Sequence, residues 1–109
     1  MNSPSSAEAG LRADGSGRVV LTGPVTFATV GDLLRASQRL FVDQKSVTVD
    51  LGSVTSVDSA GLALLLEWLR TARSAGHAVT YTRLPDKLVA IAKLSGVEGI
   101  IAAGSAAAT

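Results

Sequence analysis

Hydrophobic residues follow two different spacings along this chain, and the two spacings alternate. Apolar residues recur every three to four positions in three long stretches, as they do along one face of a helix. Between these stretches lie shorter segments that are typical of strands, in which apolar residues alternate with polar ones. The predicted helices cover residues 27–41, 59–75 and 85–94, and the predicted strands cover residues 10–13, 18–22, 46–51, 78–82 and 97–101.

Turn-forming residues separate these predicted elements. Residues 14–17 (DGSG) predict a hairpin between the first two strands. Gly23-Pro24 interrupts the second strand, and Thr26 is suited to cap the helix that follows. Residues 52–57 (GSVTSV) predict a loop, and Gly76 is suited to end the second helix.

The order of the elements indicates the fold class. Strands that are separated by helices need crossover connections, so most strands are expected to run parallel. The hairpin adds one antiparallel edge strand. We therefore expect an α/β fold with a small, mixed but mostly parallel sheet and about three helices packed on it. The 109 residues correspond to one domain, expected over residues 10–101, with disordered tails at residues 1–9 and 102–109.

The composition excludes several classes of site. The chain has no cysteine and one histidine, so disulfides, thiolate metal sites, thiol catalysis and multi-histidine metal sites are not expected. Its 10 basic and 9 acidic residues give a net charge of +1, without the basic stripe of a nucleic-acid-binding domain. A glycine-rich phosphate loop is absent from the sequence as well. We therefore expect no metal, no cofactor and no nucleic-acid partner.

The sequence also predicts a cytoplasmic protein. Its first ten residues have neither the basic nor the apolar region of a signal peptide. The longest uninterrupted aliphatic run, Leu62 to Leu66, is far shorter than the ~20 residues that span a bilayer. Direct membrane insertion is therefore not expected.

The clearest candidate site lies where the predicted 52–57 loop leads into the second helix. Ligands and partners of α/β sheets meet the carboxyl ends of the strands, and the segment Asp58-Ser59-Ala60-Gly61 lies at that position. A phosphate on Ser59 would face the free N–H groups of the helix and add negative charge beside Asp58. Ser59 is therefore a candidate phosphoacceptor. The alternative is that Asp58 or Ser59 only caps the helix, which is the commoner role.

Ser59 is not expected to be a catalytic nucleophile. A hydrolase triad needs a base within hydrogen-bond reach. The single histidine, His77, follows the other end of the same helix, about 25 Å away at ~1.5 Å per residue. Asp50 lies on the polar face of a predicted strand, and no second polar cluster supports an acid–base pair with Asp58. We therefore predict no catalytic residue and a protein that is not an enzyme.

The second helix carries two apolar stripes. At ~100° per residue, Leu64 and Trp68 point about 120–160° away from the core face, which is defined by Leu62, Leu65, Leu66 and Leu69. A surface tryptophan on an aliphatic stripe is a typical interface anchor. Leu64 and Trp68 are therefore candidate partner-binding residues. The alternative is that Trp68 folds over an edge of the first helix or over a tail.

The segment Val57-Asp58-Ser59-Ala60-Gly61-Leu62, after the strand VTVDL, resembles the signature of the STAS domain family. This family comprises the sulphate-transporter and anti-sigma-factor-antagonist domains. The resemblance extends from about Arg18 to Ile101. It implies a small α/β domain without enzymatic activity that binds partners around this loop and helix. Asp58, Ser59, Ala60 and Gly61 become candidate partner-binding residues on this ground.

Two branches of the family are candidates. The LALLL run and the segment DKLVAIAKL are most similar to MlaB-type subunits of the Mla phospholipid-transport ABC systems. The short C-terminus fits this branch, because anti-sigma-factor antagonists usually continue into a further helix. The MlaB branch implies that the protein binds and supports a cytoplasmic ABC transporter ATPase, at the inner face of the inner membrane.

The residue at position 59 favours the other branch. MlaB-type subunits often have threonine there, whereas this chain has Ser59, as the anti-sigma-factor antagonists do. The antagonist branch implies that a serine-kinase anti-sigma factor phosphorylates Ser59 and that phosphorylation releases the partner. Both branches stay open on the sequence.

Overall fold

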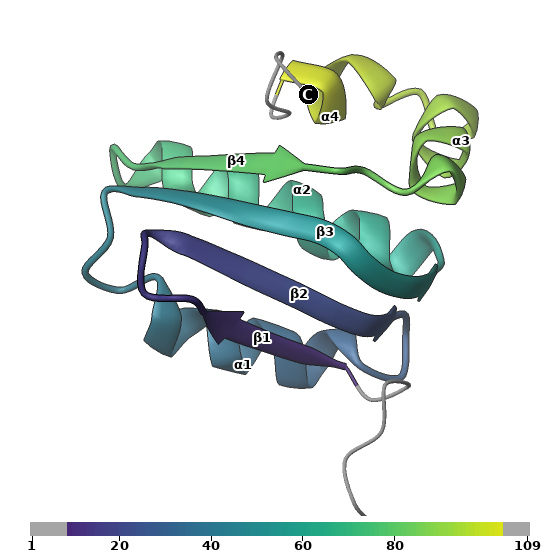
Figure 1. The fold of residues 1–109 in the computed structure, drawn as a ribbon. Coiled ribbons are helices and arrows are strands. Elements are labelled where there is room, and N and C mark those ends of the chain that lie inside the picture. The colour runs from purple at the N-terminus through teal and green to yellow at the C-terminus, as the bar shows by residue number, and fades with distance from the viewer. Residues whose placement is uncertain (1–8, 104–109) are drawn as a thin grey trace, which may run out of the picture.

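The computed structural model describes residues 9–103, which form one four-stranded sheet and four helices (Figure 1). The strands stand in the order β1-β2-β3-β4 across the sheet. The tail predictions for residues 1–8 and 104–109 lie outside the described residues. In chain order, the elements are β1 (Gly10–Ala13), β2 (Arg18–Val25), α1 (Val30–Leu40), β3 (Ser46–Val57), α2 (Ser59–Ser74), β4 (Ala78–Thr82), α3 (Asp86–Leu94) and α4 (Glu98–Ala103).

The sheet is mixed, as the alternation of elements predicts. β1 and β2 form the antiparallel hairpin, and in its turn the Ser16 N–H donates a 2.9 Å hydrogen bond to Asp14 Oδ1. β2 pairs with β3, and β3 with β4, in parallel. In Figure 1, α1 and α2 lie behind the sheet, while α3 and α4 lie beyond β4. The α/β class and the mostly parallel sheet are confirmed.

The core lies between the sheet and the layer of α1 and α2. Every second strand residue faces the helices; Leu21, Val49 and Tyr81 are fully buried there. The Tyr81 hydroxyl donates a 2.6 Å hydrogen bond to the carbonyl of Leu65 in α2. Burial also raises the pKa of Tyr81, so the phenol stays protonated and keeps donating. The bond ties the edge strand β4 to α2.

β3 is longer than the periodicity predicts, and the predicted loop at residues 52–57 is wrong. β2 also continues through Gly23-Pro24, so the two strands stay paired up to Val25 and Val57. Two register shifts interrupt this ladder, one of them next to Pro24. Bulges of this kind bend a strand and tolerate proline and glycine, which is why a turn-like sequence continues the sheet here.

α1 begins at Val30, three residues later than predicted, and the Thr26 side chain does not cap it. Instead, the Thr29 hydroxyl donates to the Pro24 carbonyl (2.9 Å) and accepts from the Thr26 N–H (3.0 Å). Threonine side chains offer the backbone such local bonds as an alternative to helix. This turn takes Phe27 out of the helix and leaves it 83% exposed.

The last predicted element has the wrong type. The spacing predicts a strand over residues 97–101, but Glu98–Ala103 form the helix α4, with Ile101 buried. A short apolar run does not distinguish strand from helix by periodicity alone. α4 is a fourth helix and reaches two residues past the predicted end of the domain. Because the chain does continue into a further helix, a short C-terminus no longer favours the MlaB branch.

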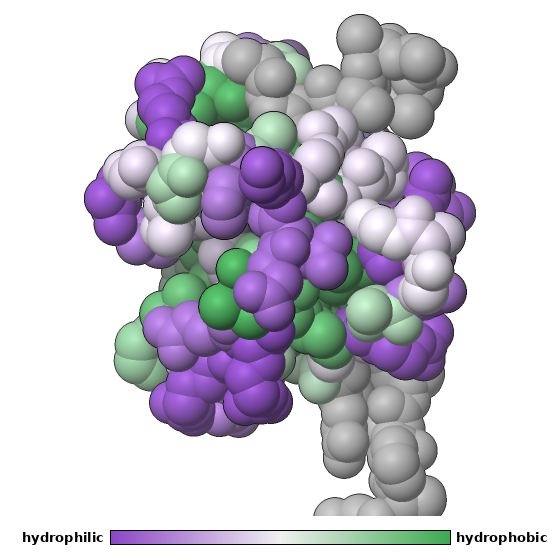
Figure 2. Space-filling model, turned by 90° about the vertical axis from the view of Figure 1, so that its left-hand side faces the viewer, coloured by the Kyte–Doolittle hydropathy of each residue, from purple (hydrophilic) through white to green (hydrophobic). Residues whose placement is uncertain are grey.

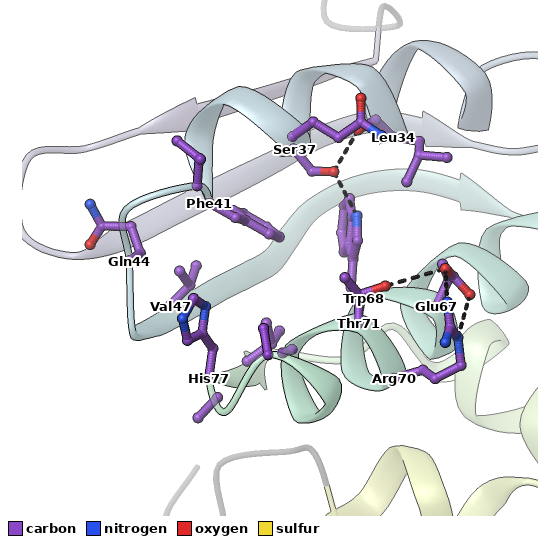
Figure 3. Close-up of a pocket in the computed structure, with 16 residues that line it drawn as sticks. Leu34, Ser37, Phe41, Gln44, Val47, Glu67, Trp68, Arg70, Thr71 and His77 are labelled. Atoms are coloured by element: carbon purple, nitrogen blue, oxygen red, sulfur yellow. Dashed lines mark hydrogen bonds and ion pairs between the residues drawn. The ribbon is translucent and has the colours of Figure 1, made fainter.

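Leu64 and Trp68 are buried, so the prediction of an exposed stripe on α2 is wrong. Trp68 is 3% exposed, and Leu64, one turn before it, is 5% exposed. The Trp68 indole N–H donates a 2.9 Å hydrogen bond to the Ser37 hydroxyl of α1, and the ring meets Phe41 edge-on at 5.4 Å (Figure 3). The prediction is wrong because a helical wheel with a single core face does not allow for α2 packing against both the sheet and α1. The alternative, in which Trp68 packs on the first helix, is confirmed.

The C-terminal halves of α1 and α2 and the first residues of β3 and β4 line an open hollow of about 540 Å³, and Trp68 and His77 are among its lining residues. Figure 2 looks onto this end of the molecule and shows hydrophobic residues at its centre among hydrophilic ones. Ser59 begins α2, whereas the hollow is lined by residues from the last turns of α2 and just beyond it. The hollow and the predicted site therefore lie at opposite ends of this helix.

Candidate functional site

One carboxylate links the end of the sheet to the amino ends of both covering helices. Asp58 is the only residue between β3 and α2. Its Oδ1 accepts the N–H of Gly61 (3.0 Å), which caps α2 as predicted. Its Oδ2 accepts the N–H of Phe27 (3.0 Å) in the turn between β2 and α1. Asp58 therefore holds two segments together that are 31 residues apart in the chain.

The same hydrogen bonds set the charge of Asp58. The N–H of Phe27 contributes most, followed by those of Gly61 and Ala60, and together they hold the pKa of Asp58 below its usual value. The carboxylate is therefore ionised at neutral pH and lies at the positive end of α2. A carboxylate with both oxygens engaged in this way is a structural anchor and is poorly suited to proton transfer.

Gly61 lets α2 approach β2 closely. A Cβ at position 61 would lie 2.1 Å from the carbonyl oxygen of Val25 and 2.8 Å from a methyl group of Val57. No side chain fits at such distances. Gly61 is itself buried, so it shapes the site from below. The glycine of the signature is explained by this packing.

The exposed surface over Asp58 and Gly61 is small, and its side chains are uncharged. Ser59 is exposed and Ala60 is half-buried at the start of α2, while Phe27 and Ala28 are exposed in the neighbouring turn. We call Phe27, Ala28, Ser59 and Ala60 the docking surface. It carries one hydroxyl and one large aromatic ring, and none of its side chains is ionisable.

The structure separates the predicted site residues into two groups. Asp58, Ser59, Ala60 and Gly61 lie together, as predicted. Leu64 and Trp68 are buried, Trp68 against α1, and neither is available as a surface contact.

Phe27 was not predicted as a site residue, because its spacing to Val30 places it on the apolar face of a longer helix. The signal that could have found it is Thr29, a good cap residue that follows Gly23-Pro24 and allows the helix to start later.

The site offers little for catalysis. His77 follows the far end of α2, as the sequence predicts, and lines the hollow there. Within residues 9–103, no three histidine or acidic side chains gather as they would around a metal ion. No helix in the same range has the length and apolarity to cross a membrane. What the arrangement provides is a hydrogen-bonded turn and helix start that carry an exposed ring and an exposed hydroxyl.

Comparison with known proteins identifies relatives. A family model described as the MlaB STAS domain matches residues 10–102. Two curated relatives are the intermembrane phospholipid transport system binding protein MlaB of Escherichia coli (strain K12) and that of Shigella flexneri. Each is 43% identical over 51 residues, which is 46% of this chain and 53% of the relative. The chain thus spans about half the length of the curated relatives it matches.

The fold has a solved counterpart. The structure of the anti-sigma factor antagonist SpoIIAA in its unphosphorylated form is similar with a TM-score of 0.66. The similarity covers 91% of this chain and 86% of that chain at 14% sequence identity, so it is a likeness of fold.

We expect Asp58→Ala to lower the free energy of unfolding at pH 7 by about 1–2 kcal/mol, because it removes a helix cap. The pKa of Asp58 is depressed in the folded state. Its contribution is therefore complete above the unfolded pKa of about 3.9 and is lost as the pH falls through the folded value. Urea unfolding of both proteins between pH 7 and pH 3 measures this. A stability difference that does not shrink at low pH would contradict the role given to the carboxylate.

Two glycine substitutions should have different effects on the free energy of unfolding. Gly61→Ala forces a Cβ against the Val25 carbonyl and should destabilise the fold by about 2 kcal/mol or more. Gly99→Ala is the matched control, because Gly99 lies in α4 with open space around its Cβ position. It should be neutral or stabilise by up to about 1 kcal/mol. Thermal unfolding of the two variants compares them, and equal effects would show that α2 does not need its close approach to β2.

Proposed function

The chain belongs to the STAS domain family in its MlaB form, and we propose that it is a non-enzymatic subunit of an Mla-type phospholipid-transport ABC system. It binds the cytoplasmic ATPase of that system and supports its assembly or activity. The docking surface makes the contact. This binding would hold the protein at the inner face of the inner membrane through its partner.

The observation that carries this proposal is the exposed Phe27 beside Ser59. Phe27 is 83% exposed, yet its N–H is held by Asp58 and its turn by Thr29. Aromatic residues are enriched at interfaces, and a contact that is already ordered loses less entropy on binding. An uncharged surface with one exposed ring on a hydrogen-bonded backbone turn suits a partner with an apolar pocket.

The family and the site support the same class of function. The relatives are described as binding proteins of a transport system. In the described residues, Ser59 has no histidine near it, and both Asp58 oxygens are engaged by backbone N–H groups. Both features fit an accessory subunit better than an enzyme.

A second candidate function is that of an anti-sigma-factor antagonist, favoured by the serine at position 59. Its hydroxyl lies in the first turn of α2, where the positive end of the helix dipole favours an added phosphate. The same phosphate would lie near the ionised Asp58 and would place nearly two negative charges on an uncharged surface. Phosphorylation would therefore change the surface that a partner meets.

The first proposal predicts that the docking surface governs binding to the purified ATPase subunit of the same organism's Mla-type system. Phe27→Ala and Ser59→Glu should each weaken the affinity by roughly tenfold or more. The first variant truncates an interface anchor, and the second places a charge in the contact. Leu94→Ala and Ser74→Glu are the matched controls, because both residues are exposed elsewhere and should leave affinity unchanged. Calorimetric titration measures all four, and wild-type affinity in both test variants would refute the assignment.

The second candidate predicts a phosphate on Ser59. Incubation with the serine-kinase anti-sigma factors of the same organism and ATP should add the mass of one phosphate, and Ser59→Ala should abolish the gain. A wild-type protein that stays unmodified with every such kinase would rule the antagonist function out.

A further inference from the structure

A nearly buried carboxylate lies on the sheet face that α1 and α2 leave uncovered. Asp50 falls between the core residues Val49 and Leu51 and points to the opposite face, yet its side chain is only 9% exposed. Its Oδ1 accepts from Arg83 Nε (2.9 Å) and from the Gly52 N–H (2.8 Å). Its Oδ2 accepts from Arg83 Nη2 (2.8 Å). Two parallel bonds between arginine and carboxylate make one of the stronger and more directional ion pairs in proteins.

Arg83 reaches Asp50 from an unfavourable backbone conformation. It follows directly after β4 and has a φ of 56°, the only positive φ of a non-glycine residue in the described part of the chain. The left-handed region costs an ordinary residue energy and persists only where the surroundings hold it. The side chain of Arg83 donates its hydrogen bonds to Asp50, so we assign to this ion pair the support of the turn from β4 into α3.

Gly52 lies directly beneath the guanidinium group. A Cβ at position 52 would be 2.3 Å from Arg83 Cζ, so a larger residue would push the arginine away from Asp50. Gly52 also lies inside the first register shift of β3, between the pairs Val20 with Asp50 and Thr22 with Ser53. A bulge leaves one residue out of the ladder. Asp50 supplies the acceptor for the Gly52 N–H at that place.

The shift at Gly52 is the first of two register shifts that together set where β3 ends; the second lies between Gly23 and Pro24. With both shifts in place, Val57 pairs with Val25, and Asp58 follows at the point where its carboxylate meets the Phe27 N–H. A slip of one residue would turn each side chain to the other face of the sheet. Asp58 would then lose Phe27, and the docking surface would lose its fixed turn.

We infer that the ion pair of Asp50 and Arg83, which lies over Gly52, positions the docking surface by fixing the first of the two register shifts of β3. The pair is about eight residues from Asp58 along the strand, or roughly 26 Å at ~3.3 Å per residue. It acts through Asp58 and touches no partner itself. Where the readout is partner affinity, this inference rests on the proposed function.

The test follows the two amide protons that Asp58 accepts, those of Phe27 and Gly61, in ¹⁵N-edited NMR spectra. Asp50→Asn keeps the shape of the side chain but removes the charge. Arg83→Lys keeps the charge but cannot form two parallel bonds. Arg18→Lys is the matched control, because Arg18 Nη1 lies 3.8 Å from Asp50 Oδ2, beyond hydrogen-bond reach. All spectra are recorded at a temperature where unfolding curves show each variant folded.

Asp50→Asn and Arg83→Lys should both shift the Phe27 amide proton upfield, as its bond to Asp58 lengthens, and weaken ATPase binding by roughly tenfold. Arg18→Lys should change neither. Loss of stability in the two test variants, with unchanged Phe27 and Gly61 shifts, would overturn the inference and leave a purely structural pair. The NMR readout needs no partner, so failure of the wild type to bind the ATPase would refute the proposed function alone. If Asp50→Asn does not fold, Arg83→Lys decides between these outcomes.

Discussion

The arrangement of this protein depends on the carboxylate of Asp58 and its two hydrogen bonds. One oxygen starts α2 and the other holds the turn before α1, so a single side chain sets how both helices leave the sheet. Two requirements follow from this position. The residue at 61 must be glycine, because α2 begins against the backbone of β2. β3 must also end in one register, because only then does Asp58 face Phe27.

The two ends of the helix layer have different physical characters. At the far end, α1 and α2 meet through Trp68, Ser37 and Phe41, so the single tryptophan strengthens the packing of the two helices. At the near end, the helices are held by Asp58, and an aromatic ring is left in solvent. The first end packs the two helices together, and the second offers an exposed ring on a backbone turn that hydrogen bonds already hold. Rigid support behind an exposed ring is what an interaction module needs.

The sequence predicts the elements with strong periodicity and misses those that depend on tertiary contacts. The hairpin, α2, the parallel strands and the cap at Asp58 follow from local spacing and turn chemistry. Local spacing does not predict that Trp68 is buried and Phe27 exposed. Burial of Trp68 requires α1 beside α2, and exposure of Phe27 requires the Thr29 turn. The register shift inside β3 involves Asp50, Gly52 and Arg83, which span 33 residues of the chain and look ordinary separately. The helical conformation of α4 is not predicted, because two neighbouring isoleucines suit a strand as well as a helix.

The most direct measurement maps the partner contact on the folded protein. It is a titration of the ¹⁵N-labelled chain with the unlabelled ATPase subunit, read as changes in the amide resonances. We predict that the largest changes lie at Phe27, Ala28, Ser59 and Ala60, with little effect at α3 and α4 or on the sheet face around Asp50. Changes concentrated at the hollow, at α3 and α4 or on the sheet face, with the docking surface unaffected, would contradict the proposal that Asp58 organises the binding site.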